Sequence, residues 1–527
     1  MLIISTVNYL KRIQVVYQVK YRLFKAKPLK YYSLNGPVYY KPLTFLDVKK
    51  MDFSVKVKQE TFFFRFLNLS KSFVGEVDWN FEGYGRLWNY NLQYMDWLNQ
   101  NSLKIQQKDE LAIDLYTYLW NGKLKMEPYP ASLRIMNGIR YLSLHEGVDS
   151  RLRNFIKSEA NFLTNRLEYH LLANHLLENA FAVYMAGVFF EETNWIKLGE
   201  SLLRKELNEQ ILDDGAHFEL SPMYHQIIFF RVLEFLAYES PESDLYAFVI
   251  QKAANMLSWL NIITFKNGQI PHFNDSINGI ALSSAQLLDI AGRLGLKVDS
   301  NHVLKDSGFR KFENDIFELI IDVHGIAPPY QPGHAHADTF TFCLNYNEKP
   351  IIVDPGISTY NIGKRRDLER STYFHNTINV NKQSSAEVWS GFRVGRRLNV
   401  DILKESPNLI EAIHNGYRIF KLNHKRKFEF SREKIEIIDH IEGDYADKKV
   451  NIQACLHFHP SVKLELIQGG EFLVDDCISL LISGFNKVYL VDYNYCLGYN
   501  KFEKAFKIIV ILDKNANNLS TIFKTRE

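Results

Sequence analysis

Residues 331–338 read Gln-Pro-Gly-His-Ala-His-Ala-Asp, and this stretch continues through Val353-Asp354-Pro355-Gly356 to Phe374-His375-Asn376-Thr377-Ile378. Apolar runs separated by turn residues predict two or three strands between residues 331 and 380. His334 and His336 are two residues apart, so on an extended strand both imidazoles would point to the same face. Together with Asp354 and His375 from neighbouring strands, they form a ligand set typical of a divalent metal, and zinc is the best-suited ion.

A second interpretation of these histidines is purely structural. The chain contains 16 histidines, so some close pairs arise by chance, and buried polar side chains are usually hydrogen-bonded to protein groups. Spacing alone does not separate the two interpretations, because only the folded chain can bring the carboxylate and the third imidazole to the pair.

The strand-rich pattern extends from this stretch to the end of the chain. Beyond Gly308 the helical period fades, and segments rich in β-branched and aromatic residues alternate with turns. They lie at residues 316–323, 339–344, 351–353, 435–441, 450–457, 487–492 and 506–512. Strands at this spacing, without helices between them, predict an antiparallel β-sandwich over residues 309–527.

The preceding half of the chain has helical periodicity from Leu87 onward. Helices are predicted at about 106–120, 131–146, 150–168, 173–191, 193–211, 222–239, 242–264 and 284–296. The connections are short and polar, so neighbouring helices should be antiparallel. Residues 61–308 are therefore expected to form an all-α domain.

Residues 1–60 form a third region, a basic arm followed by short β-like segments. No acidic residue precedes Asp47, whereas eight basic residues do, namely Lys11, Arg12, Lys20, Arg22, Lys25, Lys27, Lys30 and Lys41. Such an arm is either a peripheral contact with an anionic membrane surface or polymer, or a solvated extension. The apolar runs are too short for a signal peptide or a transmembrane helix, so the cytoplasm is the expected location, with the periplasm as the alternative.

The composition is that of a soluble globular protein, with 46% hydrophobic and 23% charged residues. A formal net charge of only +3 says little about partners, and no nucleic-acid partner is expected. The four cysteines, Cys343, Cys455, Cys477 and Cys496, are scattered without a CxxC pair. Their spacing argues against both a thiolate zinc site and a disulfide framework.

Three polar segments in the helical half could carry chemistry. Asn174, at the start of a predicted helix, is either its N-cap or an amide donor aimed into a cleft. Ser221-Pro222 predicts another helix start, which puts Tyr224 and His225 on a first turn where the helix dipole attracts anions. Tyr224 is then either a core aromatic residue or a group that faces such an anion. A turn at residues 270–275 could line the same face.

In their order along the chain, these segments resemble the heparinase II/III-like polysaccharide lyases. The resemblance covers roughly residues 60–400, and it is specific through the ordered combination of its motifs. The matching pieces are Leu87–Tyr94, Glu127–Pro130 with Arg134, Asn174–Asn179, Gly215–Glu219 with Tyr224-His225, Pro271–Asp275, Gly333–Asn379 and Trp389–Arg397.

This resemblance implies an incomplete (α/α) toroid followed by a β-sandwich, and it implies eliminative cleavage of uronic-acid-containing polysaccharides. It places Asn174, Tyr224 and His334 at catalytic positions. It places His336, Asp354 and His375 at the positions of metal ligands, so His334 moves from the metal to the cleft. The metal, expected to be zinc, would be structural, and the expected partner is an anionic polysaccharide or oligosaccharide.

The implied chemistry suits these residue types. In β-elimination the C5 proton beside the uronate carboxylate leaves, and the leaving O4 gains a proton. Neutralising the carboxylate, which is the role implied for Asn174, makes the C5 proton acidic enough to remove. Tyr224 and His334 can serve as acid and base. Further substrate-binding candidates are Arg134, His175, Glu219, His225, Asn274 and Arg393, with Arg396 and Arg397 beside the last of these.

Two other functions fit parts of the pattern. A glycoside hydrolase on the same toroid would use paired carboxylates, for which Asp213, Asp214, Glu219 and Asp275 are the candidates. A polysaccharide-binding or assembly protein of a surface-polysaccharide pathway would keep the fold without turnover. That role would suit a chain without a recognisable secretion signal.

Overall fold

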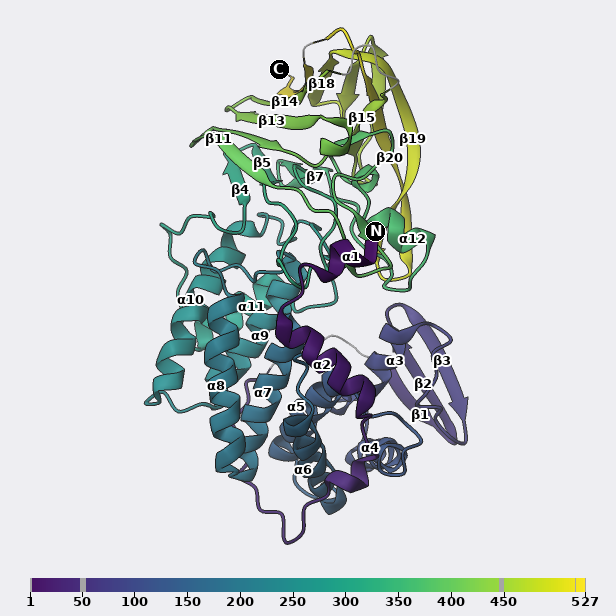
Figure 1. Ribbon diagram of the computed structural model, residues 1–527, viewed down its shortest axis with the longest axis vertical. Coiled ribbons are helices and arrows are strands. Elements are labelled where there is room, and N and C mark those ends of the chain that lie inside the picture. Colours follow the sequence, from purple (N-terminus) through teal and green to yellow (C-terminus); the bar gives the residue numbers. More distant parts are fainter. Residues whose placement is uncertain (1, 48–53, 445–449, 517, 527) are drawn as a thin grey trace.

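The computed structural model describes residues 2–47, 54–444, 450–516 and 518–526. A helical toroid and a strand-rich sandwich are stacked along the long axis of the molecule (Figure 1). The predicted fold class, an incomplete (α/α) toroid followed by an antiparallel β-sandwich, is confirmed.

The N-terminal arm contains two helices that the sequence pattern did not predict, α1 (Leu2–Val7) and α2 (Arg12–Leu23). A three-stranded antiparallel sheet follows, made of β1 (Ser54–Lys58), β2 (Thr61–Phe66) and β3 (Leu69–Val74). The expected division after residue 60 therefore falls inside a hairpin, between β1 and β2.

The toroid consists of α3 (Arg86–Gln93), α4 (Ile105–Trp120), α5 (Pro128–Leu144), α6 (Ser150–Asn165), α7 (Ala173–Phe190), α8 (Thr193–Gln210), α9 (Pro222–Tyr238), α10 (Asp244–Ile263) and α11 (Ser284–Arg293). The eight helices predicted from residue 106 to 296 are all present, with ends that differ by at most three residues. The predicted start of α9 is confirmed. Pro222 occupies its first turn, and the Ser221 side chain accepts a hydrogen bond from the N–H of Tyr224 at 3.2 Å.

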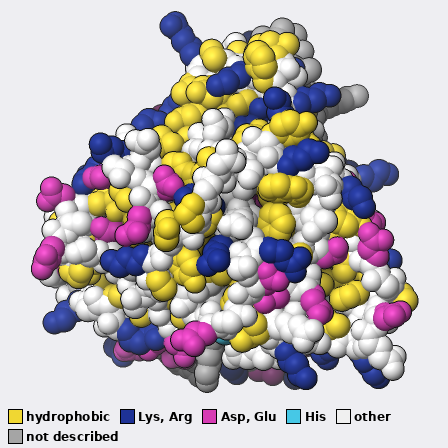
Figure 2. All heavy atoms as spheres, turned by 90° about the horizontal axis from the view of Figure 1, so that it is seen from below, with side chains coloured by type: hydrophobic (Ala, Val, Ile, Leu, Met, Phe, Trp, Pro, Cys, Tyr) yellow, Lys and Arg dark blue, Asp and Glu magenta, His cyan; other side chains and the backbone are white. Residues whose placement is uncertain are grey.

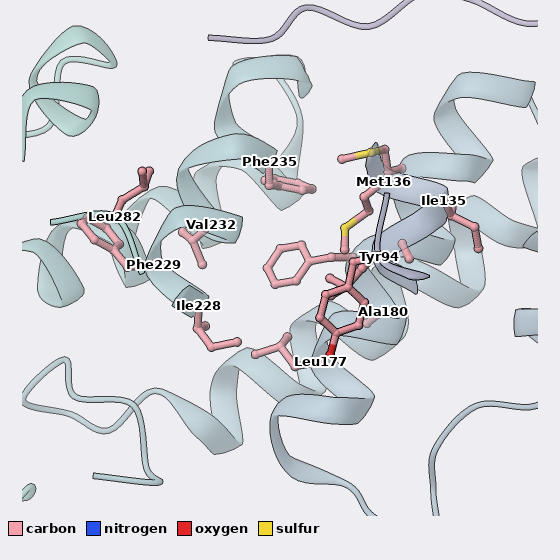
Figure 3. Packing of buried hydrophobic residues seen from close by; sticks show 14 of the residues in the cluster. Tyr94, Ile135, Met136, Leu177, Ala180, Ile228, Phe229, Val232, Phe235 and Leu282 are labelled. Atoms are coloured by element: carbon pink, nitrogen blue, oxygen red, sulfur yellow. The ribbon is translucent and has the colours of Figure 1, made fainter. Parts of the chain in front are cut away.

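The inner helices α5, α7 and α9 are buried on nearly every side. Figure 3 shows Leu177 of α7 and Ile228 of α9 pointing toward each other, with Met136 of α5 and Phe235 of α9 in the same core. A helix surrounded in this way has apolar residues all round. The polar residues that these helices do carry must therefore be paired inside the core or face the cleft.

The sandwich is built from three larger antiparallel sheets. The first has the order β4-β5-β6-β7: β4 (Phe309–Glu313), β5 (Phe317–Asp322), β6 (Phe342–Tyr346) and β7 (Lys349–Ile352). The second has the order β19-β20-β15-β8: β19 (Phe485–Gly498), β20 (Lys501–Leu512), β15 (Ile452–His457) and β8 (Ile378–Val380).

The third sheet is eight-stranded, with the order β11-β12-β13-β14-β21-β18-β17-β16. Its strands are β11 (Val400–Ser406), β12 (Leu409–His414), β13 (Asn423–Phe430), β14 (Lys434–Glu442), β16 (Leu464–Gln468), β17 (Glu471–Val474), β18 (Ile478–Ser483) and β21 (Leu519–Thr525). A short pair, β9 (Val388–Trp389) and β10 (Arg393–Val394), and helix α12 (Lys364–Glu369) lie in the connections.

The segment that contains His334 and His336 is a loop. Residues 331–341 form turns between β5 and β6, so the prediction of an extended strand here was wrong. Around the two histidines, the loop is bonded to a turn of the toroid. The N–H of Asp275 donates to the carbonyl of His334 at 3.0 Å, and the N–H of His336 donates to Oδ1 of Asn274 at 2.8 Å.

The long hairpin β19–β20 makes a second connection between the domains. At its tip, Nδ2 of Asn500 donates to the carbonyl of Leu67 at 3.0 Å. In return, Nδ2 of Asn68 donates to the carbonyl of Tyr499 at 2.9 Å. The sandwich thus reaches across to the turn between β2 and β3, on the rim of the cleft described next.

Candidate active site

A cleft of ≈ 1750 Å³ lies where the toroid meets the sandwich. Its walls come from α3, α7 and α9 of the toroid, from α2, and from sandwich loops that contribute His334, Tyr360 and Tyr499. Asn174, Tyr224 and His334 all line it. The fold thus brings to one cleft three residues that are 160 positions apart in the sequence from first to last.

His334 is held by a buried carboxylate. Its Nδ1 lies 2.8 Å from Oδ2 of Asp275, and its Nε2 has no hydrogen-bond partner among the described residues. A carboxylate at Nδ1 fixes the tautomer in which Nε2 is the proton acceptor. Asp275 is also bonded by both terminal nitrogens of Arg366, one of them at 2.6 Å. Burial opposes ionisation of Asp275, but Arg366 and the imidazoles outweigh it and hold the pKa of this carboxyl well below its ordinary value.

Tyr224 packs directly on the imidazole of His334, with ring centroids 3.9 Å apart. Its Oη lies 3.2 Å from Oη of Tyr360, which in turn lies 3.5 Å from Nδ1 of His334. Burial, followed by the neighbouring Tyr499 and Tyr129, raises the pKa of Tyr224 well above its ordinary value. Tyr224 is therefore a neutral phenol that has a proton to donate.

Asn174 lies in the first turn of α7, and the N-cap of that helix is Leu172, so the N-cap interpretation of Asn174 was wrong. Its Nδ2 donates to the two carboxylate oxygens of Glu219, at 2.8 and 3.1 Å. Glu219 also lines the cleft. The carboxylate therefore fixes the orientation of the amide on the cleft wall.

His175 follows Asn174 and lines the same wall. Its ring packs on Tyr129 with centroids 4.5 Å apart, and its Nδ1 lies 3.2 Å from Oε1 of Glu168. Burial opposes protonation of His175, but Glu168, followed by Glu219 and Glu178, raises its pKa above the ordinary value. The raised pKa extends to higher pH the range over which His175 carries a positive charge at the cleft wall.

Arg134, another substrate-binding candidate, lies outside the cleft lining. It is fully buried, and its Nη2 lies 2.6 Å from Oε1 of Glu159, which is itself fully buried. Nη1 donates to Oε1 of Gln93 at 3.3 Å. Arg134 therefore belongs to an internal ion pair, and the expectation that it binds substrate was wrong.

Three further candidates also lie outside the lining. His225 is fully buried, Nε2 lies 3.1 Å from the carbonyl of Met256, and burial lowers its pKa to about 3. Asn274 bonds His336 on one side and donates from its N–H to Asp338 at 3.0 Å on the other. Arg393 is exposed and lies over the ring of Trp389, 5.1 Å from its centroid.

Arg396 and Arg397 face the sandwich. Arg396 donates to the carbonyl of Ser385 at 3.1 Å, and Arg397 donates to the carbonyl of Pro329. Both side chains are thus bonded to backbone carbonyls, and neither arginine lines the cleft.

The carboxylates proposed for a hydrolase do not form a pair. Glu219 lines the cleft, but Asp213 is exposed outside it. Asp214 accepts from Ser307, with its Oδ2 2.7 Å from the hydroxyl, and Asp275 is bonded to Arg366. The retaining or inverting arrangement of two carboxyl groups across a sugar is therefore absent from these four residues.

A cluster of possible metal ligands lies behind His334. One ligand atom from each of His336, Asp338 and His375 lies within 4.8 Å of the others, and all three residues are buried. Nδ1 of His336 and Nε2 of His375 are buried without a hydrogen-bond partner. Buried polar atoms seldom lack a partner, so these two nitrogens fit a cation.

Asp354 was expected to be a ligand, but Asp338 takes that place in the cluster. Oδ2 of Asp354 lies 2.7 Å from Nδ1 of His375, on the opposite side of the ring from the unpartnered Nε2. Asp354 therefore orients His375, as carboxylates commonly do for metal-binding imidazoles. The presence of a metal stays a prediction.

Several residues of the site were not found from the sequence. Tyr360 contacts both Tyr224 and His334, and Arg366 neutralises Asp275. Tyr499 comes from the tip of the β19–β20 hairpin, more than 150 residues beyond His334. No local motif marks these residues, although Tyr360 lies only four positions after the Val-Asp-Pro-Gly turn.

Solved structures share this arrangement of toroid and sandwich. A crystal structure of heparinase III superposes with a TM-score of 0.65 at 16% identity, covering 86% of this chain and 79% of that chain. The heparan sulfate lyase HepC from Pedobacter heparinus superposes with a TM-score of 0.57 at 19% identity, covering 86% and 78%. At these identities the likeness shows a shared toroid-and-sandwich fold.

The sequence identifies the family. Residues 74–288 match the heparinase II/III N-terminus, and residues 298–521 match the heparinase II/III-like C-terminal region. The chain belongs to the heparinase II/III-like family.

Two curated relatives are heparin-sulfate lyases. The chain is 26% identical over 344 residues to the protein from Bacteroides stercoris and 27% identical over 338 residues to the protein from Pedobacter heparinus. These matches cover 55% and 58% of this chain, and 49% of each relative. The chain thus spans about half the length of the curated relatives it matches.

Substitution of Arg134 tests its structural role. Arg134→Met leaves the Glu159 carboxylate buried without its cation, so the free energy of unfolding should fall by about 3–5 kcal/mol. Urea unfolding followed by tryptophan fluorescence measures this change. Arg393→Met, at an exposed position, is the matched control and should stay within about 0.5 kcal/mol of the wild type. If the Arg134→Met variant had normal stability but bound substrate more weakly, Arg134 would be a substrate-binding residue after all.

Proposed function

We propose that the protein is a polysaccharide lyase that cleaves an anionic, uronic-acid-containing polysaccharide by β-elimination. The observation that carries this proposal is the convergence of Asn174, Tyr224 and His334 on one cleft, with His334 held by the ionised Asp275. The names of the two curated relatives, both heparin-sulfate lyases, support the same class of reaction.

The charge of the cleft wall favours an anionic polymer. Arg22, Lys25 and Arg65 line the cleft, and in the described part of the chain none of them has a carboxylate partner. Unpaired cations along a cleft raise the local concentration of a polyanion and speed its association. Neutral polymers would gain nothing from this arrangement.

In the proposed reaction, the uronate carboxylate binds beside Asn174. One N–H of its amide is shared between the two oxygens of Glu219, the other N–H donates to the uronate carboxylate, and protonated His175 adds positive charge nearby. Both interactions strengthen as negative charge moves from C5 onto the carboxylate in the transition state. Glu219 contributes by holding the amide of Asn174 in place.

The proton transfers follow from the protonation states of the site. Nε2 of His334 takes the C5 proton, and the released electron pair forms the C4–C5 double bond as the C4–O4 bond breaks. The leaving O4 takes the proton of the neutral Tyr224 phenol. The products are an unsaturated uronate and a polymer with a new hydroxyl end.

We also propose that His336, Asp338 and His375 hold a divalent cation, with zinc suited to two imidazoles and a carboxylate. When bound, the cation would supply charge to a buried acidic region and link the 331–341 loop to the segment before β8. Its role in this proposal is structural, because the cluster lies behind His334 and outside the cleft lining.

Product analysis tests the lyase proposal. Uronate-containing polysaccharides should yield an unsaturated product that absorbs in the far ultraviolet, and Tyr224→Phe and His334→Ala should each lower kcat by about 10²–10⁴-fold. Tyr39→Phe, at an exposed tyrosine outside the cleft, is the matched control and should keep full activity. Cleavage without new absorbance would indicate a hydrolase, and binding without cleavage would indicate a binding or assembly protein.

The pH dependence of substrate binding tests the role of His175. Its pKa is raised, so the favourable positive charge is present at low pH and is lost as the pH rises through that pKa. KM for the polymer should therefore rise by about tenfold across this range, the value of a charge-assisted hydrogen bond of ~1.5 kcal/mol. His175→Gln should have a flat KM profile over the same range. An unchanged pH profile in this variant would exclude His175 from substrate binding.

Metal analysis of the purified protein tests the proposed cluster. Mass spectrometry should find about one zinc per chain, and chelation should lower the thermal unfolding midpoint because metal binding is coupled to folding. His375→Ala should abolish the bound metal, whereas the matched variant His459→Ala, outside the cluster, should retain it. A metal-free protein whose unfolding midpoint does not respond to zinc would contradict the proposal.

A further inference from the structure

Helix α2 is bonded to the protein through the polar side chains of one face. It crosses the toroid helices, with its first turn near α1 and the sandwich (Figure 1). Just before its first turn, the ammonium of Lys11 pairs with Glu209, and within the helix Nε2 of Gln14 donates to the carbonyl of Leu171 at 3.1 Å. In its last turn, Oη of Tyr21 donates to the carbonyl of Leu167 at 2.7 Å. These contacts fix which side of the helix faces outward.

The outward side of α2 and its C-cap carries several exposed apolar side chains. Each of these apolar residues is between 37% and 71% exposed, and they are Ile13, Val15, Val16, Val19, Leu23 and Phe24. Val16, Val19 and Leu23 are spaced by three and four positions, so they form one stripe along the helix. An ordinary surface helix turns such a stripe inward, so its exposure marks a contact surface.

Basic residues flank this stripe. Arg12, Lys20 and Arg22 are exposed on the same helix, and residues 2–46 contain no aspartate or glutamate. In Figure 2 the molecule is turned so that the side facing the reader in Figure 1 points upward. The upper edge of this view carries hydrophobic and basic side chains with almost no acidic ones. An apolar stripe with basic borders is the pattern of helices that lie in the interface of an anionic bilayer.

We propose that the outward face of α2 docks this protein on an anionic lipid surface, with the helix lying parallel to the membrane plane. The apolar stripe enters the boundary between headgroups and acyl chains, and Arg12 and Lys20 contact the lipid phosphates. No helix in the described part of the chain is long and apolar enough to span a bilayer, so the contact is interfacial.

Charge distinguishes a lipid surface from a second copy of the chain. A two-fold dimer through this face would bring α2 against the same helix of its partner. The basic residues of the two copies would then face one another without acidic residues from the same region to balance them. An anionic lipid surface offers acyl chains to the apolar stripe and negative charge to the basic residues.

This inference does not rest on the proposed lyase activity. Helix α2 precedes residues 74–288, where the family match begins, so it is a feature of this chain beyond that match. The same helix contributes Gln18 and Tyr21 to the cleft wall. Docking would therefore hold the cleft beside the membrane surface, whatever reaction takes place there.

Vesicle flotation with the full-length protein tests the proposal. The wild type should float with vesicles of phosphatidylcholine mixed with phosphatidylglycerol, and its binding should weaken as salt is raised. The double variant Val19→Glu/Leu23→Glu should bind at least about tenfold more weakly, because it puts charge into the stripe. Arg12→Gln/Lys20→Gln should also bind more weakly, through loss of attraction to the anionic headgroups.

The matched control is Val74→Glu/Val303→Glu, which introduces the same charge at side chains that are 77% and 71% exposed away from α2. It should bind like the wild type, and all variants should keep the wild-type thermal midpoint. The proposal is overturned if wild-type protein fails to float, or if Val19→Glu/Leu23→Glu floats normally. Equal binding to pure phosphatidylcholine would also overturn it, as would a dimer in light scattering that this variant dissociates.

Discussion

The carboxylate of Asp275 is the interaction on which the site depends. It lies in a toroid turn and is bonded by His334 and His336 from the sandwich loop and by Arg366 of α12. A buried charge with one partner is costly, but a carboxylate bonded by a guanidinium and two imidazoles is compensated at every lone pair. One ion therefore joins the two domains, orients the cleft imidazole and orients the imidazole of the possible metal cluster.

Most of the architecture could be predicted because periodicity survives in long elements. The toroid helices from α4 to α11 have the helical period, β14 alternates between buried and half-buried residues, and β5 is a short apolar run that is buried throughout. Helix α2 was not predicted because its uncharged polar side chains, such as Gln14, face inward while its apolar ones are exposed beside basic residues, and because valines are common in strands. Its helical state is fixed by contacts with the toroid, which no local pattern encodes.

The site could be predicted where a motif indicates which way a side chain points. The prediction failed where burial decides what the side chain contacts. Tyr224 was placed on a helix start, and the resemblance to the lyase family implied the cleft position of His334; both line the cleft. Arg134 differs from a cleft arginine only in facing Glu159. The prediction of which residues bind the metal failed for a related reason. On an alternating strand His334, His336 and Asp338 would all share one face. In the loop His334 lines the cleft, whereas Asp338 lies with His336 and His375.

The tip of the β19–β20 hairpin bears on how a long polymer could reach the cleft. Its contact with the β2–β3 turn consists of two side-chain amide hydrogen bonds, Asn500 to Leu67 and Asn68 to Tyr499, both on the rim. Two such bonds contribute about 1–3 kcal/mol in total. At RT of about 0.6 kcal/mol, two bonds of this strength alone would be broken in roughly one molecule in six to one in 150 at any moment. A contact this weak would let a sugar chain enter the cleft from the side, without being threaded from its end.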